Sequence, residues 1–188
     1  MLSWFNTPQA PYSRYLLLDR DGILNENRAD YVKSMEEVKF YPDALEALGL
    51  LCSRKIGVIL ISNQSGINRG LISWQNFWRM HEGIIERVEQ CGGSILAAYY
   101  CPHRPDEKCG CRKPSAAMLL AACRFAGIEP SQTSFIGDHE TDMQAAAGAG
   151  CRGIRVCRGD QPHPTDTCTA GYPVYTSLLE VVVDLCHP

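Results

Sequence analysis

The chain contains 188 residues, a length that allows one substantial hydrophobic core and leaves little room for a second. Hydrophobic residues make up 45% of it and charged residues 21%, a composition that excludes a disordered or fibrous protein. The formal net charge of -3 provides no general positive field, which excludes nucleic acid and anionic membranes as general partners.

Nothing in the sequence indicates export or membrane insertion. The stretch from Met1 to Arg14 lacks a basic start and is interrupted by Pro8 and Pro11. No window approaches the run of roughly 18 apolar residues that a membrane helix needs. We therefore expect a cytoplasmic protein, with no membrane or nucleic-acid partner, that acts as a monomer. In that compartment the 10 cysteines are expected to be reduced thiols rather than disulfides.

Short apolar runs alternate with helical segments along the chain. The runs at 15–18, 56–61, 95–100 and 133–136 predict buried parallel strands, each ending in polar residues. The segments with helical spacing are about 43–54, 73–90, 114–126 and 141–149. A proline-containing loop, 159–171, is expected before a last strand and helix.

This alternation predicts an α/β fold with a single Rossmann-like, doubly wound parallel sheet and helices on both faces. We expect one domain over residues 1–188, with its core at about 14–158. Roughly thirty residues separate the first polar strand end from the second strand, too few for a large cap domain. Because the carboxyl ends of parallel strands lie along one edge of the sheet, the polar residues there should converge on one site.

Two carboxylates, Asp19 and Asp21, follow the first predicted strand. Residues two apart on an extended backbone point to the same side, so these carboxylates are expected to work together. One can attack phosphorus as a nucleophile while the other donates a proton and later activates water. On its own this motif is equally compatible with a solvated turn.

Other polar residues near predicted strand ends favour phosphoryl transfer. Asp138 and Asp142 offer the hard oxygen ligands that Mg²⁺ prefers. Ser62 and Asn63 offer a hydroxyl and an amide to phosphoryl oxygens, and Lys113 offers a cation for the charge that develops in transfer. Each alone has an ordinary explanation, such as a turn or a helix N-terminus, but their joint occurrence in this order favours an active site.

Three cysteines and one histidine share a short loop, 101–111. The four are Cys101, His103, Cys109 and Cys111. Three thiolates and one imidazole form a complete tetrahedral set for Zn²⁺, which is typical of structural rather than catalytic sites. Such a site would hold the loop that carries Arg112 and Lys113; the alternative is four unliganded side chains.

The segments LLLDRDG, ILISNQSG, CRKP and FIGDHETD resemble the four motifs of the haloacid dehalogenase superfamily, over about 15–156. The resemblance implies a magnesium-dependent phosphatase that works through an aspartyl-phosphate intermediate. It implies that Asp19 is the nucleophile, Asp21 the general acid and base, and Ser62 a donor to the phosphoryl group. It also implies that Lys113 neutralises the phosphorylated aspartate.

For the metal, the resemblance implies that Mg²⁺ is bound by Asp19, the backbone carbonyl of Asp21, and Asp138. Asp142 is then expected to orient Lys113 or a metal-bound water. The predicted cofactors are therefore Mg²⁺ and Zn²⁺.

Within the superfamily, DRDG, NQSGINRG, YYCPH and CRKP resemble the heptose-bisphosphate and histidinol-phosphate phosphatases, both of which carry a zinc loop. This predicts a small phosphorylated metabolite as substrate, and NQSGINRG favours a heptose 1,7-bisphosphate cleaved at its 7-phosphate. The candidate substrate-binding residues are Asn63, Gln64, Arg69 and Arg112. Arg69 and Arg112 are expected to bind the second phosphate by bidentate hydrogen bonds.

Three alternatives remain open at this stage. The five-residue interval between His103 and Cys109 favours a histidinol-phosphate phosphatase. A non-catalytic, zinc-stabilised binding domain would lack phosphatase activity altogether. A nucleic-acid 3′-phosphatase would show a basic stripe with stacking aromatic residues, and the sequence contains none.

Overall fold

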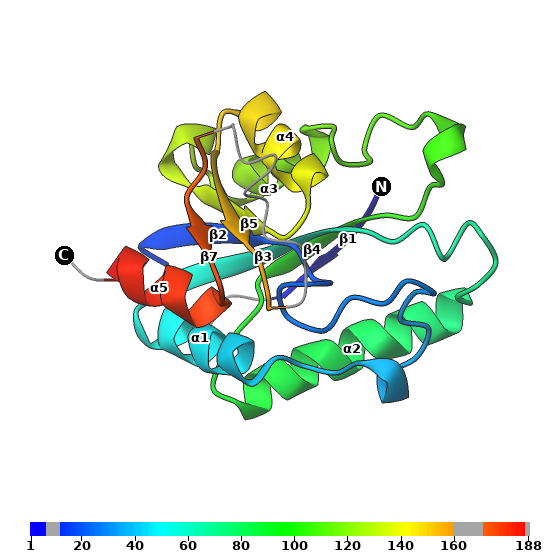
Figure 1. Ribbon diagram of the computed structural model, residues 1–188, viewed down its shortest axis with the longest axis horizontal. Coiled ribbons are helices and arrows are strands. Elements are labelled where there is room, and N and C mark those ends of the chain that lie inside the picture. Colours follow the sequence, from blue (N-terminus) through cyan, green and yellow to red (C-terminus); the bar gives the residue numbers. More distant parts are fainter. Residues whose placement is uncertain (7–11, 160–170, 187–188) are drawn as a thin grey trace.

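A seven-stranded β-sheet lies at the centre of the structure, in the order β1-β4-β3-β2-β5-β6-β7 (Figure 1). The structure is a computed structural model that describes residues 1–6, 12–159 and 171–186. All neighbouring strands are parallel except β1, which pairs antiparallel with β4. The strands are β1 (Leu2–Phe5), β2 (Arg14–Leu18), β3 (Ile56–Asn63), β4 (Ala97–Cys101), β5 (Ser134–Gly137), β6 (Arg152–Val156) and β7 (Val174–Tyr175).

Helices cover both faces of this sheet. Figure 1 shows α1, α2 and α5 on one face and α3 and α4 on the other. The α-helices are α1 (Pro42–Ser53), α2 (Trp74–Gln90), α3 (Ala117–Ala126), α4 (Glu140–Ala149) and α5 (Leu178–Cys186). Short 3-10 helices occupy Met35–Glu37, Pro105–Glu107 and Pro130–Gln132. The doubly wound α/β fold expected from the sequence is therefore confirmed.

The strands carry continuous apolar runs because both of their faces are buried. In β2, Leu16 and Leu18 enter the core under α1, α2 and α5, while Leu17 enters the core under α3 and α4. β5 divides in the same way, with Phe135 on the second face and Ile136 on the first. The two-residue period of a strand thus supplies two hydrophobic cores from one short sequence.

The four predicted parallel strands are confirmed to within two residues at either end. Two further strands, β1 and β6, were not predicted. β1 has only four residues, which alternate between exposed and half-buried, and β6 contains two arginines and a glycine in place of an apolar run. The loop expected at 159–171 lies mostly outside the described residues, but the strand and helix expected after it are present as β7 and α5.

One helix begins later than predicted. α3 starts at Ala117 and not at Pro114. The preceding residues remain tied to the loop before them, because the Ser115 hydroxyl donates a hydrogen bond to the Gly110 carbonyl at 2.6 Å and accepts one from the Ala117 amide. Lys113 consequently lies in a turn between the cysteine loop and α3.

The order of the strands determines where a ligand can bind. From β2 the chain moves to one side through β3 and β4, then returns to the other side through β5, β6 and β7. The point where the direction reverses lies between β2 and β5, and such a switch point opens a crevice at the carboxyl ends of the strands. Residues 19–41, which lead from β2 to α1, contain one 3-10 turn and no additional domain over this crevice.

In the described ranges, no helix has both the length and the apolar character needed to cross a membrane.

Candidate active site and cysteine–histidine cluster

A cavity of about 610 Å³ opens at the carboxyl ends of β2, β3 and β5. It brings together residues from all four motif segments. Of the residues predicted from the sequence, those that line it are Asp19, Asp21, Ser62, Asn63, Gln64, Cys109, Arg112, Lys113, Asp138 and Asp142. The convergence of polar strand ends that the topology demands is therefore present.

A buried lysine connects the central carboxylates. Lys113 Nζ lies 2.9 Å from Asp19 Oδ2 and 2.7 Å from Asp142 Oδ1. It also donates a hydrogen bond to the Ile61 carbonyl at 3.0 Å, inside β3. Burial alone would lower the pKa of Lys113, but the Asp142 and Asp19 carboxylates outweigh burial and raise this pKa. Lys113 is therefore a fixed cation beside Asp19.

The carboxylates around Lys113 carry more negative charge than one lysine can balance. Burial raises the pKa of Asp19 to about 7; Lys113 opposes this shift, and the Asp142 and Asp138 carboxylates add to it. Burial and the Asp142 carboxylate likewise raise the pKa of Asp138 to about 6. Oxygen atoms of Asp19, Asp138 and Asp142 all lie within 4.8 Å of one another. This donor set and its surplus of negative charge suit a hard divalent cation such as Mg²⁺.

Two residues that the sequence analysis overlooked hold Asp21. The Arg20 guanidinium donates to both Asp21 oxygens, at 2.8 to 3.0 Å, and Asn25 Nδ2 donates to Oδ1 at 2.8 Å. Arg20 and Asn25 are fully buried. The available signal was an arginine between two aspartates at a strand end, where a buried cation needs a carboxylate partner.

Two predicted substrate ligands, Asn63 and Gln64, hydrogen-bond to other residues of the cavity. The Asn63 side chain forms a reciprocal pair with the Lys113 backbone: its Oδ1 accepts from the Lys113 amide at 3.1 Å and its Nδ2 donates to the Lys113 carbonyl at 3.2 Å. Gln64 Nε2 donates to Asp21 Oδ2 at 2.7 Å and to Ser62 Oγ at 3.0 Å. Both amides are engaged because they sit where the motif segments meet, so each fixes a neighbouring residue of the cavity.

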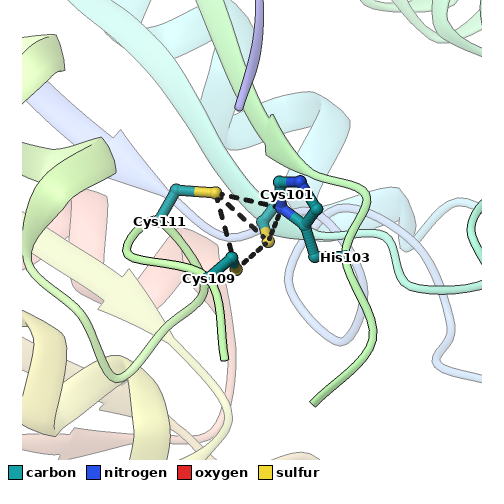
Figure 2. Close-up of side chains that lie close together, drawn as sticks. All are labelled: Cys101, His103, Cys109 and Cys111. Carbon is teal, nitrogen blue, oxygen red and sulfur yellow. Dashed lines mark hydrogen bonds between the residues drawn. The ribbon is translucent and has the colours of Figure 1, made fainter. Parts of the chain in front are cut away.

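The side chains of the predicted zinc set meet in one cluster (Figure 2). The Sγ atoms of Cys101, Cys109 and Cys111 lie 3.5 to 3.8 Å apart, and His103 Nδ1 lies 3.4 to 3.6 Å from two of them. Ligands at tetrahedral positions around Zn²⁺ would lie about 3.6 to 3.8 Å apart, given zinc–ligand distances of about 2.0 to 2.3 Å. The geometry and the chemistry of this donor set thus fit a closed zinc site.

Positively charged side chains, most of them from the cysteine loop or next to it, border the cavity. Arg28, Arg104, Lys108 and Arg112 line it, and Arg112 Nη1 donates to the His103 carbonyl at 3.4 Å. Arg69 does not line this cavity, contrary to the expectation that it joins Arg112. It is exposed, lies in the turn after β3, and borders a separate hollow with Leu71, Arg104, Pro105 and Asp106.

Comparison with known proteins agrees with the fold and this geometry. The HAD-hydrolase-like family model matches residues 110–181. The structure resembles that of D,D-heptose 1,7-bisphosphate phosphatase from Bordetella bronchiseptica, solved with magnesium and phosphate, with a TM-score of 0.83 and 32% identity over 92% of this chain and 97% of that chain. The fold is thus that of a haloacid dehalogenase-like hydrolase.

Curated relatives narrow this class. D-glycero-beta-D-manno-heptose-1,7-bisphosphate 7-phosphatase from Pseudomonas aeruginosa is 37% identical over 144 residues, which span 77% of this chain and 81% of the relative. This chain belongs to the family of the heptose-bisphosphate phosphatases within those hydrolases. A histidine biosynthesis bifunctional protein HisB from Campylobacter jejuni is 33% identical over 76% of this chain but only 41% of its own length.

The close approach of Gly22 to Asp138 gives a test of the site geometry. Gly22 has a φ of +83°, and a Cβ there would lie 2.0 Å from Asp138 Oδ2. Gly70 has a similar φ of +72° with nothing within 4 Å, so it is a matched control for backbone strain alone. Gly70→Ala should lower the free energy of unfolding by about 1 to 2 kcal/mol. Gly22→Ala should lower it by about 1 to 3 kcal/mol more, because Asp138 must move.

Urea unfolding of both variants beside the unaltered protein measures the two losses. Equal losses in the two variants would contradict the close packing of Gly22 against Asp138.

Proposed function

We propose that the chain is a magnesium-dependent phosphatase that removes the 7-phosphate from D-glycero-D-manno-heptose 1,7-bisphosphate through a phosphorylated aspartate. The main support is the position of Asp19, buried at the end of the central strand beside Lys113 and two further carboxylates. The relatives' name specifies the β anomer, which is therefore the first substrate to test.

In the proposed first step, an Asp19 carboxylate oxygen attacks phosphorus and the bond from phosphorus to the sugar oxygen breaks. Asp21 gives its proton to that departing oxygen. In the second step water attacks phosphorus, its proton passes to Asp21, and inorganic phosphate leaves Asp19. Lys113 and Ser62 stabilise the charge on the transferring phosphoryl oxygens.

The pKa of Asp19 explains why this nucleophile would need a cation. Burial raises the pKa of Asp19 to about 7, a shift toward the protonated form, and a protonated carboxyl group is a poor nucleophile. Asp19, Asp138 and the Asp21 carbonyl would hold Mg²⁺, which would supply positive charge that favours the carboxylate form and offsets the phosphate charge. Asp142 then serves chiefly to hold Lys113, from which it lies 2.7 Å away.

The cysteine–histidine cluster is proposed to bind one structural Zn²⁺. All four ligands would come from side chains, which would leave no open coordination position for substrate. Cys111 directly precedes Arg112 and Lys113, and Cys109 itself lines the cavity. Zinc would therefore hold the segment that contributes both cations to the site.

A histidinol-phosphate phosphatase is the second candidate function. The interval between His103 and Cys109 and the Campylobacter jejuni relative favour it. One phosphate is sufficient to pair with Lys113 and Ser62. The additional positive charges at the border of the cavity therefore favour a substrate with a second phosphate. Turnover rates on both heptose 1,7-bisphosphate anomers, histidinol phosphate and fructose 1,6-bisphosphate, measured side by side, distinguish the candidates.

Asp19→Asn should abolish turnover while the protein remains folded, because the amide is a poor nucleophile in a nearly identical shape. Loss of a covalent nucleophile is expected to lower the rate on the order of 10⁴-fold or more. Phosphate release from heptose bisphosphate measures this rate, and thermal unfolding confirms the fold. Asp184→Asn, on α5 and hydrogen-bonded to Tyr175, is the control and should keep normal activity. Comparable activity in both variants would refute the covalent mechanism.

The purified protein should contain about one zinc per chain, separate from exchangeable magnesium. Cys109→Ser should lower the zinc content, the unfolding temperature and the activity together, since the loop would lose a ligand. Cys52→Ser, a half-buried cysteine on α1 outside the cluster, should change none of them. Elemental analysis and thermal unfolding test this, and a zinc-free protein of unchanged stability would exclude the structural role.

Substitutions of Arg112 and Arg69 test whether the second phosphate binds in the cavity or in the neighbouring hollow. If Arg112 binds it, Arg112→Ala should lose a charge-assisted hydrogen bond of about 1.5 to 3 kcal/mol, or roughly ten- to a hundredfold in kcat/KM. The loss should be confined to bisphosphates, because a monophosphate has no group at that position. Arg69→Ala should have the smaller effect, since Arg69 lies outside the cavity.

The measurement is kcat/KM on heptose bisphosphate and on a monophosphate for both variants. A larger bisphosphate-specific loss in Arg69→Ala would assign the second phosphate to the hollow beside Arg104. Equal losses on both substrates in Arg112→Ala would contradict the role of Arg112.

A further inference from the structure

The Asp21 carboxylate has an unusually complete set of hydrogen-bond donors. Its Oδ1 accepts from Arg20 Nε, Arg20 Nη2 and Asn25 Nδ2, and its Oδ2 accepts from Arg20 Nη2 and Gln64 Nε2. A carboxylate offers about four lone-pair sites, so these contacts engage both oxygens fully. The side chain is nevertheless 20% exposed toward the cavity. Asp21 is thus held in one orientation at the edge of the reaction site.

Arg20 is the strongest of these donors, and stability does not account for it well. Its side chain is 2% exposed, and Asp21 is the only carboxylate that pairs with it in the described residues. A buried arginine–carboxylate pair contributes little net stability, because desolvation of the two charges offsets their attraction. A hydrophobic side chain of similar length would fill the same space. The guanidinium therefore needs another explanation.

The surroundings of Arg20 leave Asp21 as its electrostatic partner. His81 on α2 and Tyr100 on β4 lie near it, and they form a hydrogen bond of 2.8 Å with each other. Burial, and to a smaller extent the Arg20 cation, lower the pKa of His81 to about 4, so His81 is neutral at physiological pH. Burial raises the pKa of Tyr100, so this hydroxyl does not ionise either. Neither His81 nor Tyr100 therefore carries a charge that competes with the Arg20–Asp21 pair.

The two oxygens of Asp21 differ in how they can lose a donor. Both donors to Oδ2 have a second acceptor: Arg20 Nη2 also reaches Oδ1, and Gln64 Nε2 also reaches Ser62 Oγ. Oδ2 can therefore take up a proton while Arg20 and Asn25 retain the carboxyl group through Oδ1. Gln64 Nε2 also links Oδ2 to Ser62, the side chain proposed to bind the phosphoryl group, because it donates to both.

We propose that Arg20 is a positioning residue that fixes the Asp21 carboxyl group through Oδ1, so that Oδ2 is the oxygen that transfers protons. This proposal rests on the proposed function, in which Asp21 protonates the departing sugar oxygen and later accepts a proton from water. The Arg20 side chain is not among those that line the cavity, and the hydrogen bond from Arg20 to Asp19 Oδ1, at 2.7 Å, comes from the backbone amide, which a side-chain substitution retains. Its loss should impair the two proton transfers and leave the attack by Asp19 intact.

The leaving group of the substrate separates these effects. A sugar oxygen leaves as a strongly basic alkoxide and needs a proton, whereas p-nitrophenolate is a stable anion and leaves without one. Phosphorylation of Asp19 by p-nitrophenyl phosphate therefore does not depend on Asp21, although the later attack by water does. A variant with a misplaced Asp21 should release one p-nitrophenolate per active site quickly and then turn over slowly.

Two substitutions test the role of Arg20. Arg20→Met retains the apolar bulk and removes the charge, and Arg20→Lys retains the charge but cannot span both oxygens. Arg158→Lys is the matched control, because Arg158 also makes a bidentate pair, with Asp43, and binds the Gly22 and Ile23 carbonyls without touching Asp21. Thermal unfolding of each variant reports its stability.

For Arg20→Met we expect kcat on heptose bisphosphate to fall about 10² to 10⁴-fold, the usual contribution of a general acid or base, with little change in KM. The rate of the first-turnover burst with p-nitrophenyl phosphate should stay within a few-fold of the unaltered enzyme. Arg20→Lys should show the same pattern with a smaller loss. Arg158→Lys should lower the burst rate and the sugar-phosphate rate in equal proportion.

If the Arg20 variants lose as much in the p-nitrophenyl phosphate burst rate as in kcat on heptose bisphosphate, or if kcat is unchanged, the proposal is overturned while the phosphatase function stays intact. If Arg20→Met does not fold, the burst and kcat of Arg20→Lys decide in the same way. An unaltered protein that hydrolyses neither ester in the presence of Mg²⁺ would instead overturn the proposed function, and the role of Arg20 with it.

Discussion

The contact on which the rest of the site depends is the buried Lys113 ammonium between Asp19 and Asp142. These three side chains come from the end of β2, the turn before α3 and the first turn of α4, and Lys113 also binds the Ile61 carbonyl inside β3. Charges buried this deeply are tolerated only when paired, so the ion pairs determine the relative positions of these elements. The same constraint places Asp19 at the meeting point of the strand ends.

The residues of the site are held in place by two different parts of the structure. Asp19, Asp21 and Ser62 are held by the sheet and by buried side chains, whereas the cationic border of the cavity lies largely on the cysteine loop. That loop contains only a 3-10 turn, Pro105–Glu107, and has no α-helix or strand to stiffen it between Cys101 and α3. Four side chains with the chemistry of metal ligands meet in this loop, and a metal ion bound by them would supply the missing stiffness locally. An active site without a cap domain can in this way still present arginines to a substrate.

The sequence was sufficient to predict four of the parallel strands and the convergence of the motif residues, because apolar runs ending in polar residues follow directly from a buried parallel sheet. It was insufficient for β1 and β6, whose short or charged sequences lack that signal. It also missed Arg20 and Asn25, and it did not show that Arg69 and Arg112 border different hollows. These omissions share one cause: the direction of a side chain in a turn depends on tertiary packing, which periodicity does not report.

The reciprocal hydrogen bonds between Asn63 and the Lys113 backbone have a consequence for how this loop can vary. They resemble the hydrogen bonds between neighbouring strands, so they fix the position of the Lys113 backbone beside β3 although Lys113 belongs to no strand. Residues between His103 and Cys109 lie upstream of that anchor. Insertions or deletions there can reshape the cationic border, and with it substrate preference, without displacing the lysine. Related enzymes with different substrates can therefore differ in this interval while keeping the same reaction chemistry.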